Sequence, residues 1–535
     1  MATAKRLYLY SVAAVGLALA LLGAATMIRI LLSHLNVGLQ MPGDVASAAD
    51  RDALAMAFGL AVTGMVVWLL HWSVLERMVQ GEEESPTAER RSIVRSVYLF
   101  AVLATTLLIT ASMTASLATK VIADRLNAPG TGTWSPLSLL PAVDDGWQFA
   151  AIIVAGATFG YHVWIRNRDL RQTALISGAA AWISRYYLYG AAFLGLITAL
   201  DNIAGFFRII AGEWASLSAP GAPVDLFGGA ALASGSWIRP AVGACVAVVV
   251  WAAVWGGHWL YSERLRKSAS EQGQAEQVSR VRLAFLASVV LWGAAVATTG
   301  VAQGLGWLLA KLLDVSGSAP TWYSVFVPPI AAIPAAVALW WHRRQALSEE
   351  ASGPAGVSAT RITLYLIALV GLAAVVAGAN QIILAALDQA FSPIREFSGS
   401  SWKLPAALGL GLVVVGAAVW AWSWRQVLAR CLADAVKELA SAARAYYLYL
   451  VLGASVVMVA VSLADILYRY GRLALGLHDD ALWASVDSRL AMLVVAGAVL
   501  AFHWRVLSRD LASPGYGSTP EVPAARSARA KVAAK

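Results

Sequence analysis

The sequence predicts an all-α integral membrane protein with about 12 transmembrane helices, arranged as six tandem, parallel two-helix repeats. Hydrophobic residues make up 59% of its 535 residues and charged residues only 13%, whereas soluble domains average about 25% charged residues. Most of the apolar stretches run for about 20 residues or longer, enough for a helix to cross a hydrocarbon core about 30 Å thick. Every second stretch also opens with the same arginine and aromatic pattern. Composition, stretch length and this recurring pattern together indicate a multipass membrane fold.

Twelve apolar segments meet the length requirement. In chain order they cover residues 6–33, 52–79, 92–123, 147–166, 182–212, 238–263, 281–312, 323–342, 360–391, 403–427, 445–473 and 486–507. Each must be helical, because a single segment in lipid has to satisfy the hydrogen bonds of its own backbone. The segments lack the polar alternation of a lumen-facing strand, which argues against a barrel. We expect the first segment to be retained and not cleaved as a signal peptide, because it opens like the other odd-numbered segments.

An arginine followed by aromatic side chains opens each odd-numbered segment. The six openings are Arg6 to Tyr10, Arg95 to Phe100, Arg185 to Tyr189, Arg280 to Phe285, Arg361 to Tyr365 and Arg444 to Tyr449. Five even-numbered segments end with a histidine beside a tryptophan, as in His71-Trp72 and His503-Trp504. The fifth repeat differs, because it ends in Trp420-Ala-Trp-Ser-Trp424 without a histidine. These aromatic openings and endings are typical of the belts found at the two membrane interfaces.

Each repeat contains one opening and one ending and therefore crosses the membrane twice. The predicted repeats are residues 1–80, 90–170, 180–268, 278–348, 358–435 and 440–510. Because every copy returns to its starting side, the copies are parallel and related by axes along the membrane normal. Residues 512–535 follow as a basic tail rich in Pro, Gly, Ser and Ala, which we expect to be disordered and cytoplasmic.

Lysine and arginine are distributed unevenly between the two sides of the predicted fold. The side that holds both termini carries 28 of the 40 Lys and Arg, and the opposite side carries 12. By the positive-inside rule, both termini are cytoplasmic. The formal net charge of +9 follows from this asymmetry. The basic composition therefore does not indicate binding to nucleic acid.

Six polar side chains lie within odd-numbered segments, where an ionisable group costs a few kcal/mol or more. They are Asp201, Asn202, Gln303, Asn380, Gln381 and Asp465. One interpretation is that these groups line a polar path or a binding cavity open to the outside. The other is structural: Asp201 pairs with Arg208 and Asp465 pairs with Arg469, close enough to the outer interface to be hydrated.

The histidines at the even-numbered endings form a second candidate set. They are His71, His162, His258, His342 and His503. Imidazole ligation of haem across helices is a known use of such residues in membranes, and a quinone contact is a further option. The alternative is that they are interfacial anchors, because all five lie beside tryptophan at one membrane boundary.

Other motifs point to packing. Gly300 and Gly304 have the small-xxx-small spacing of closely packed membrane helices. Pro328, Pro329 and Pro334 should break or kink the eighth segment, since proline cannot donate the helical hydrogen bond. The only cysteines, Cys245 and Cys431, provide no metal-ligand spacing, and the sequence contains no phosphate-binding loop or nucleophile motif. We therefore predict neither catalytic residues nor a metal site.

The Arg-x-Tyr-Leu-Tyr opening and the His-Trp ending resemble a bacterial membrane-helix repeat known only as a domain of unknown function. The resemblance covers about residues 5–510 and is strongest at Arg6 to Tyr10, Arg185 to Tyr189 and Arg444 to Tyr449. It implies a bacterial cytoplasmic membrane protein built from several such units. The family supplies no catalytic residues to carry over to this chain.

Three functions are compatible with these features. The first is a non-enzymatic structural or accessory subunit that binds lipid or other membrane proteins and carries no cofactor. The second is a transporter or channel for a small solute, with the six polar residues along its path. The third is a redox protein that binds haem or quinone through the histidines. The aromatic belts and the lack of catalytic motifs favour the first.

Overall fold

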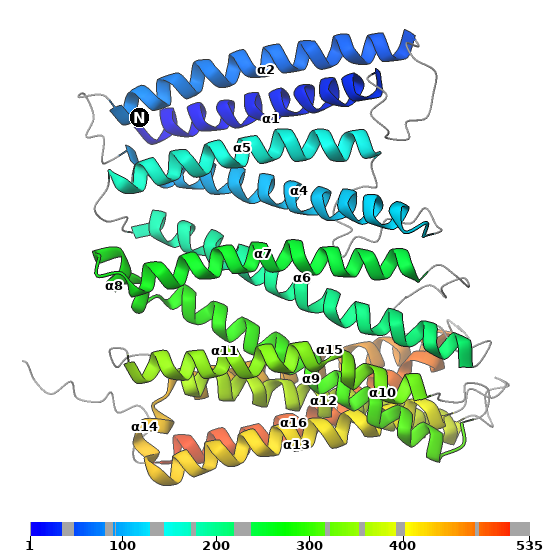
Figure 1. Cartoon of the computed structure of the whole chain (residues 1–535). Coiled ribbons are helices and arrows are strands. Elements are labelled where there is room, and N and C mark those ends of the chain that lie inside the picture. The colour runs from blue at the N-terminus through cyan, green and yellow to red at the C-terminus, as the bar shows by residue number, and fades with distance from the viewer. Residues whose placement is uncertain are drawn as a thin grey trace, which may run out of the picture. The chain divides into compact units, whose positions relative to one another are not determined.

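The computed structural model is a set of long helices (Figure 1). It describes residues 2–34, 48–80, 89–90, 92–128, 144–172, 178–218, 237–315, 322–352, 359–391, 402–476 and 481–513. Across these ranges there is no strand, and 12 helices are long and apolar enough to span a membrane. The predicted fold class is confirmed: the chain is a multipass helical membrane protein. The predicted tail at 512–535 lies outside the described residues except for its first two positions.

The chain divides into two compact units, Met1–Phe285 and Leu286–Lys535. The first contains α1 (Ala2–His34), α2 (Ala48–Gln80), α4 (Ile93–Arg125), α5 (Asp145–Arg171), α6 (Gly178–Ser218), α7 (Ile238–Lys267), α8 (Glu271–Gln277) and the start of α9 (Arg280–Leu312). The second contains the rest of α9 with α10 (Trp322–Ala331), α11 (Ile333–Ser352), α12 (Ala359–Phe391), α13 (Lys403–Ala433), α14 (Ala435–Leu439), α15 (Ala442–Ala474) and α16 (Ala481–Leu511).

Consecutive long helices pack as hairpins. In the first unit α1 packs on α2, α4 on α5 and α6 on α7, and Figure 1 shows α1 and α2 side by side in blue. In the second unit α12 packs on α13 and α15 on α16. The helices α9 and α10 also meet, because a β-carbon at Gly304 would lie 2.6 Å from the carbonyl oxygen of Val325. The predicted glycine motif therefore lies at a helix contact.

Glycine lets the backbones of α1 and α2 approach closely. A β-carbon at Gly64 on α2 would lie 2.3 Å from the nitrogen of Ala20 on α1. In the other direction, a β-carbon at Gly23 would lie 2.4 Å from the nitrogen of Ala61. Real side chains never come this near to backbone atoms, so only glycine fits at either position. Small residues serve the same purpose at many membrane helix interfaces.

The predicted break in the eighth segment is observed. The helix α10 ends at Ala331 and α11 begins at Ile333, with Ala332 in a turn between them. Pro328 and Pro329 lie inside α10, where they remove two backbone donors from the helical ladder.

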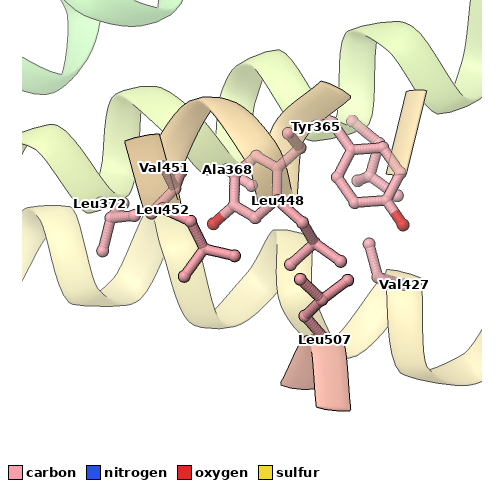
Figure 2. Close-up of a cluster of buried hydrophobic side chains, with 10 residues drawn as sticks. Tyr365, Ala368, Leu372, Val427, Leu448, Val451, Leu452 and Leu507 are labelled. Atoms are coloured by element: carbon pink, nitrogen blue, oxygen red, sulfur yellow. The ribbon is translucent and has the colours of Figure 1, made fainter. Parts of the chain in front are cut away.

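Large apolar side chains serve two purposes in this fold. Figure 2 shows one buried cluster in the second unit, where Tyr365 of α12, Val427 of α13, Leu448 of α15 and Leu507 of α16 come together. Many others are exposed, including Tyr446 of α15 with 77% of its surface accessible. Exposed apolar side chains are expected on helices that face lipid, because lipid tails are as apolar as leucine.

Candidate functional site

The first arginine–glutamate cluster connects hairpins of the first unit at the end of the helices where the arginine openings lie. Arg6 on α1 pairs with Glu89, with 2.6 Å between Nε and Oε2, and Tyr10 donates to the other carboxylate oxygen at 3.1 Å. Arg95 on α4 donates to the Tyr10 hydroxyl at 3.2 Å and pairs with Asp169 on α5 at 2.8 Å. Glu89 is fully buried and Arg95 is 1% exposed. Side chains from α1, α4 and α5 are thus linked in one network beside a buried carboxylate.

The second cluster repeats this arrangement with α6, α7, α8 and the start of α9. Arg185 pairs with Glu276 at 2.8 Å, and the Tyr189 hydroxyl donates to the second oxygen of Glu276 at 2.5 Å. Arg282 donates to the Tyr189 hydroxyl at 3.2 Å and pairs with Glu263 on α7. Glu276 and Arg282 are each 1% exposed.

The third cluster has the same geometry in the second unit. Arg361 on α12 pairs with Glu438 on α14 at 2.7 Å, and Tyr365 donates to the other oxygen of Glu438 at 2.8 Å. Arg444 on α15 donates to the Tyr365 hydroxyl at 3.3 Å. It also forms a bidentate ion pair with Asp510 on α16, with hydrogen bonds of 2.7 and 2.9 Å. The three clusters therefore share one plan: arginine, glutamate, tyrosine and a second arginine.

A short motif, Glu-x-x-Ser-x-x-Arg, positions the carboxylate and the second arginine in all three clusters. It covers residues 89–95, 276–282 and 438–444. In each copy the serine N–H donates to the carbonyl oxygen of the glutamate, at 3.0 or 3.1 Å, which turns the chain into the next long helix. Two of the glutamates lie on the short helices α8 and α14, which are capped by Ser270 and Asp434. Such caps satisfy backbone donors at a helix start.

Each second arginine also lies over a tryptophan from a neighbouring helix. The guanidinium carbon is 5.5 Å from the ring of Trp72 for Arg95 and 4.7 Å from that of Trp259 for Arg282. Arg444 lies 6.0 Å from the ring of Trp424. Cation–π contacts of this kind contribute about 0.5–2 kcal/mol, more when the pair is desolvated. The tryptophans of the endings are therefore part of the clusters and not only interfacial anchors.

Charge is balanced within the first and third clusters. In the first, Arg168 also pairs with Glu76 at 2.6 Å, and Glu76 receives Arg95 at 3.0 Å. In the third, Arg361 and Arg444 face Glu438 and Asp510. Buried ion pairs need this neutrality, because removal of one partner leaves an uncompensated charge at a cost of about 3–5 kcal/mol. The clusters are suited to holding hairpins together.

The candidate histidines lie close to these clusters. Each ring Nδ1 lies 2.7–2.9 Å from the backbone carbonyl four residues earlier. The Nε2 of His162, His258 and His503 faces a tyrosine hydroxyl at 3.5, 3.3 and 3.3 Å, respectively. His342 is fully buried, and His71 lies edge-on to the ring of Tyr8.

The fifth repeat lacks both the histidine and the tyrosine that faces it in the first repeat. Ser423 precedes Trp424 where His71 precedes Trp72, and it is fully buried. The tyrosine two residues after the first arginine, Tyr8 in the first repeat, is replaced by the buried Thr363. Both members of the aromatic pair are thus exchanged for small hydroxyl residues.

The six predicted polar residues are not joined by hydrogen bonds or ion pairs to one another in the described part of the chain. Asp201 is exposed and pairs with Arg208 at 3.5 Å, and Asp465 pairs with Arg469 at 2.8 Å and with Arg489 at 3.2 Å. The two ion pairs of the structural interpretation are therefore observed.

The four amides behave differently from the two aspartates. Asn202 is fully buried and donates to the Thr198 carbonyl at 2.7 Å, while its own oxygen has no partner among the described residues. The side-chain oxygens of Asn380 and Gln381 on α12 are also buried without a described partner. Gln303 on α9 is half-buried.

Sequence reasoning missed the glutamates and misplaced one arginine. Glu89, Glu276 and Glu438 lie between the predicted apolar segments and are not among the predicted candidate residues. In the fourth repeat the arginine of the cluster is Arg282 and not Arg280, which is exposed. The signal that identifies all of them is the recurrence of Glu-x-x-Ser-x-x-Arg.

A family model described as Domain of unknown function (DUF5671) matches the chain twice, over residues 6–143 and 361–488. No curated protein and no solved structure matches the chain. The two matched regions begin at Arg6 and Arg361, the first arginines of the first and third clusters. The family match thus confirms the resemblance to a repeated domain of unknown function. These two regions are similar to the DUF5671 domain, whose function is unknown, and the chain that contains them is a multipass helical membrane protein.

Proposed function

We propose that the protein is a non-enzymatic structural or accessory subunit of a bacterial cytoplasmic membrane, where it binds lipid and other membrane proteins. The main support for this proposal is that the buried charged side chains are paired. The buried arginines and carboxylates of the three clusters pair with one another across hairpins. Paired in this way, they stabilise a fixed arrangement of helices and do not present free acids or bases to a substrate.

Contacts at the opposite end of the first unit support the same reading. Arg29 on α1 pairs with Asp144 at 2.8 Å, and Lys120 on α4 pairs with Asp145 at the start of α5. Arg239 on α7 pairs with Asp124 on α4. Ion pairs at both ends of the helices favour a rigid scaffold.

The surface supports binding to lipid and to membrane proteins. Along α15, Tyr446, Tyr449, Leu450 and Val457 each expose more than half of their surface. Rigid aromatic side chains of this kind bury a large area at little entropic cost when a partner helix packs on them.

Mass spectrometry after gentle purification from the native membrane tests this function. We expect at least one protein partner in constant ratio to the chain, together with retained lipid. An unrelated multipass protein purified in parallel identifies contaminants. A chain that is consistently recovered alone contradicts the scaffold proposal.

The orientation is a further part of the proposal. An even number of spans would put both termini on one side of the membrane, and the excess of arginine and lysine predicted for that side supports a cytoplasmic location. A C-terminal fluorescent-protein fusion should therefore be bright and a C-terminal alkaline phosphatase fusion inactive. The opposite pattern contradicts this orientation.

A transporter or channel is the second candidate, because of the buried amide oxygens of Asn202, Asn380 and Gln381. A buried acceptor without a partner costs about 1–3 kcal/mol and suits a polar solute. Asn380→Leu and Gln381→Leu should then abolish solute flux in proteoliposomes and leave the fold intact. Variants that only raise thermal stability would assign these amides to packing.

We propose further that the histidines bind no haem. In support, both ring nitrogens of His162 and His503 have hydrogen-bond partners within the chain. A reduced-minus-oxidised spectrum of the purified protein should therefore lack a Soret band, and a Soret band that disappears in His503→Ala would favour the redox alternative.

A further inference from the structure

A small cavity lies beside the second cluster, between α5, α6, α7 and α8. Its volume is about 50 Å³, and its polar lining comes from Arg166, Ser184, Arg185, Gln272 and Glu276. Each water-sized group needs about 10–15 Å³, so this half-open cavity accommodates about four such groups. This is the size of one phosphate group with its four oxygens.

Arg166 is the unusual residue of this cavity. Its guanidinium lies 5.1 Å from the ring centre of Tyr261 on α7 and 5.5 Å from that of Phe100 on α4. It forms no hydrogen bond or ion pair with any described residue, and its Nε is buried. Two residues later, Arg168 is paired with both Glu76 and Asp169. The same helix therefore carries one neutralised arginine and one that is held in place by aromatic rings alone.

The charge of Arg166 is not compensated by the rest of the lining. Arg185 is neutralised by Glu276, and both oxygens of that carboxylate already accept hydrogen bonds, from Arg185 and Tyr189. The lining therefore keeps one positive charge. The Ser184 hydroxyl and the Gln272 amide have no described partner and add donors to the same cavity.

We propose that this cavity binds one phosphate-type oxyanion, carried by the headgroup of an anionic phospholipid, with Arg166 as its main ligand. Arginine pairs with phosphate through two parallel hydrogen bonds, and the stacked rings hold the guanidinium in position for this. The cavity lies at the arginine end of the hairpins, which the orientation proposed above places at the anionic cytoplasmic leaflet. The inference specifies the lipid of the proposed scaffold and rests on that proposal only for the choice of leaflet.

Lipid binding to the detergent-purified full chain tests the site by native mass spectrometry. The probes are phosphatidylglycerol and phosphatidylcholine, and the variants are Arg166→Gln and Arg171→Gln. Arg171 lies on the same helix, is exposed and has no partner among the described residues, so it controls for loss of charge alone. We expect Arg166→Gln to weaken phosphatidylglycerol binding about tenfold or more, since hydrogen bonds to a charged group are lost. Arg171→Gln should leave the binding unchanged.

A second arm distinguishes the source of the oxyanion. Calorimetric titration with inorganic phosphate should show no binding to the wild-type chain at concentrations where the lipid binds. If inorganic phosphate binds and Arg166→Gln abolishes this binding, the site takes a free anion and the headgroup assignment is overturned. Equal affinity of both variants for phosphatidylglycerol overturns the site itself. Partner retention in Arg166→Gln, measured separately, reports on the scaffold proposal independently of lipid.

Discussion

At the scale of single residues, a fully buried glutamate is the centre of each cluster. Glu89, Glu276 and Glu438 each accept from one arginine and one tyrosine of the preceding hairpin. Ionised groups remain stable in such surroundings only when every lone pair and every positive charge has a partner. The cost of removing the carboxylate should therefore greatly exceed that of a surface substitution.

Glu276→Gln should lower the free energy of unfolding by about 3–5 kcal/mol, because Arg185 loses the charge that balances it. Glu271→Gln is the matched control: Glu271 is exposed on the same short helix, and its loss should cost less than about 1 kcal/mol. Thermal unfolding of both variants in detergent measures the difference. Equal melting temperatures would show that the cluster does not stabilise the fold.

The sequence predicted part of this site and missed part of it. The arginine and tyrosine of each opening stand out because they are close together in the chain. Their glutamate does not, because it follows Arg6 by 83 residues, Arg185 by 91 and Arg361 by 77. Only the fold brings these residues together, so an inspection of local patterns assigns the arginines to the membrane interface and overlooks their burial.

At the scale of elements, the sequence predicts the long helices but not the short ones. Hydropathy predicted all 12 spanning segments, and the prolines predicted the break between α10 and α11. The short helices α8 and α14 were not predicted, because they are polar and have fewer than eight residues. Their caps are local, but their buried glutamates depend on distant partners.

The hairpin α1–α2 offers a test of close backbone packing. Gly64→Ala should destabilise the protein by about 1–3 kcal/mol, because the added methyl group would meet the backbone of Ala20. Gly59→Ala on the same helix should be neutral or slightly stabilising, because nothing lies within 4 Å of the new methyl group and alanine favours helix. Thermal unfolding of the two variants checks this, and similar losses in both would contradict the close contact.

At the scale of the whole molecule, the clusters give the chain a longer internal period than the two-helix repeat. Arg6, Arg185 and Arg361 are separated by 179 and 176 residues, so each period contains two hairpins and one cluster. The family model matches most of the first and third periods, over residues 6–143 and 361–488, and no part of the second. The geometry of the second cluster nevertheless follows the same plan, with tryptophan beneath Arg282 as it lies beneath Arg95.

If the three periods are equivalent, Arg95→Gln, Arg282→Gln and Arg444→Gln should each destabilise the protein by about 3–5 kcal/mol. Arg280→Gln, two residues from the second of these, should have little effect because Arg280 is exposed. Thermal unfolding of the four variants measures whether the three clusters contribute equally to stability. A mild effect of Arg282→Gln beside severe effects of the other two would show that the second cluster has lost its structural role.

The order of residues within each cluster has a consequence for biosynthesis. The arginine and tyrosine are made first, and their glutamate leaves the ribosome 77–91 residues later. At a synthesis rate of about 5–20 residues per second, the delay is roughly 4–20 seconds. During this interval the first hairpin of each period can enter the bilayer while its arginine still lacks a counter-ion. The carboxylate and the second arginine, six residues apart in the motif, then join the first hairpin to the opening helix of the next one. Growth of the chain thereby sets the sequence of assembly, from one pair of hairpins to the next.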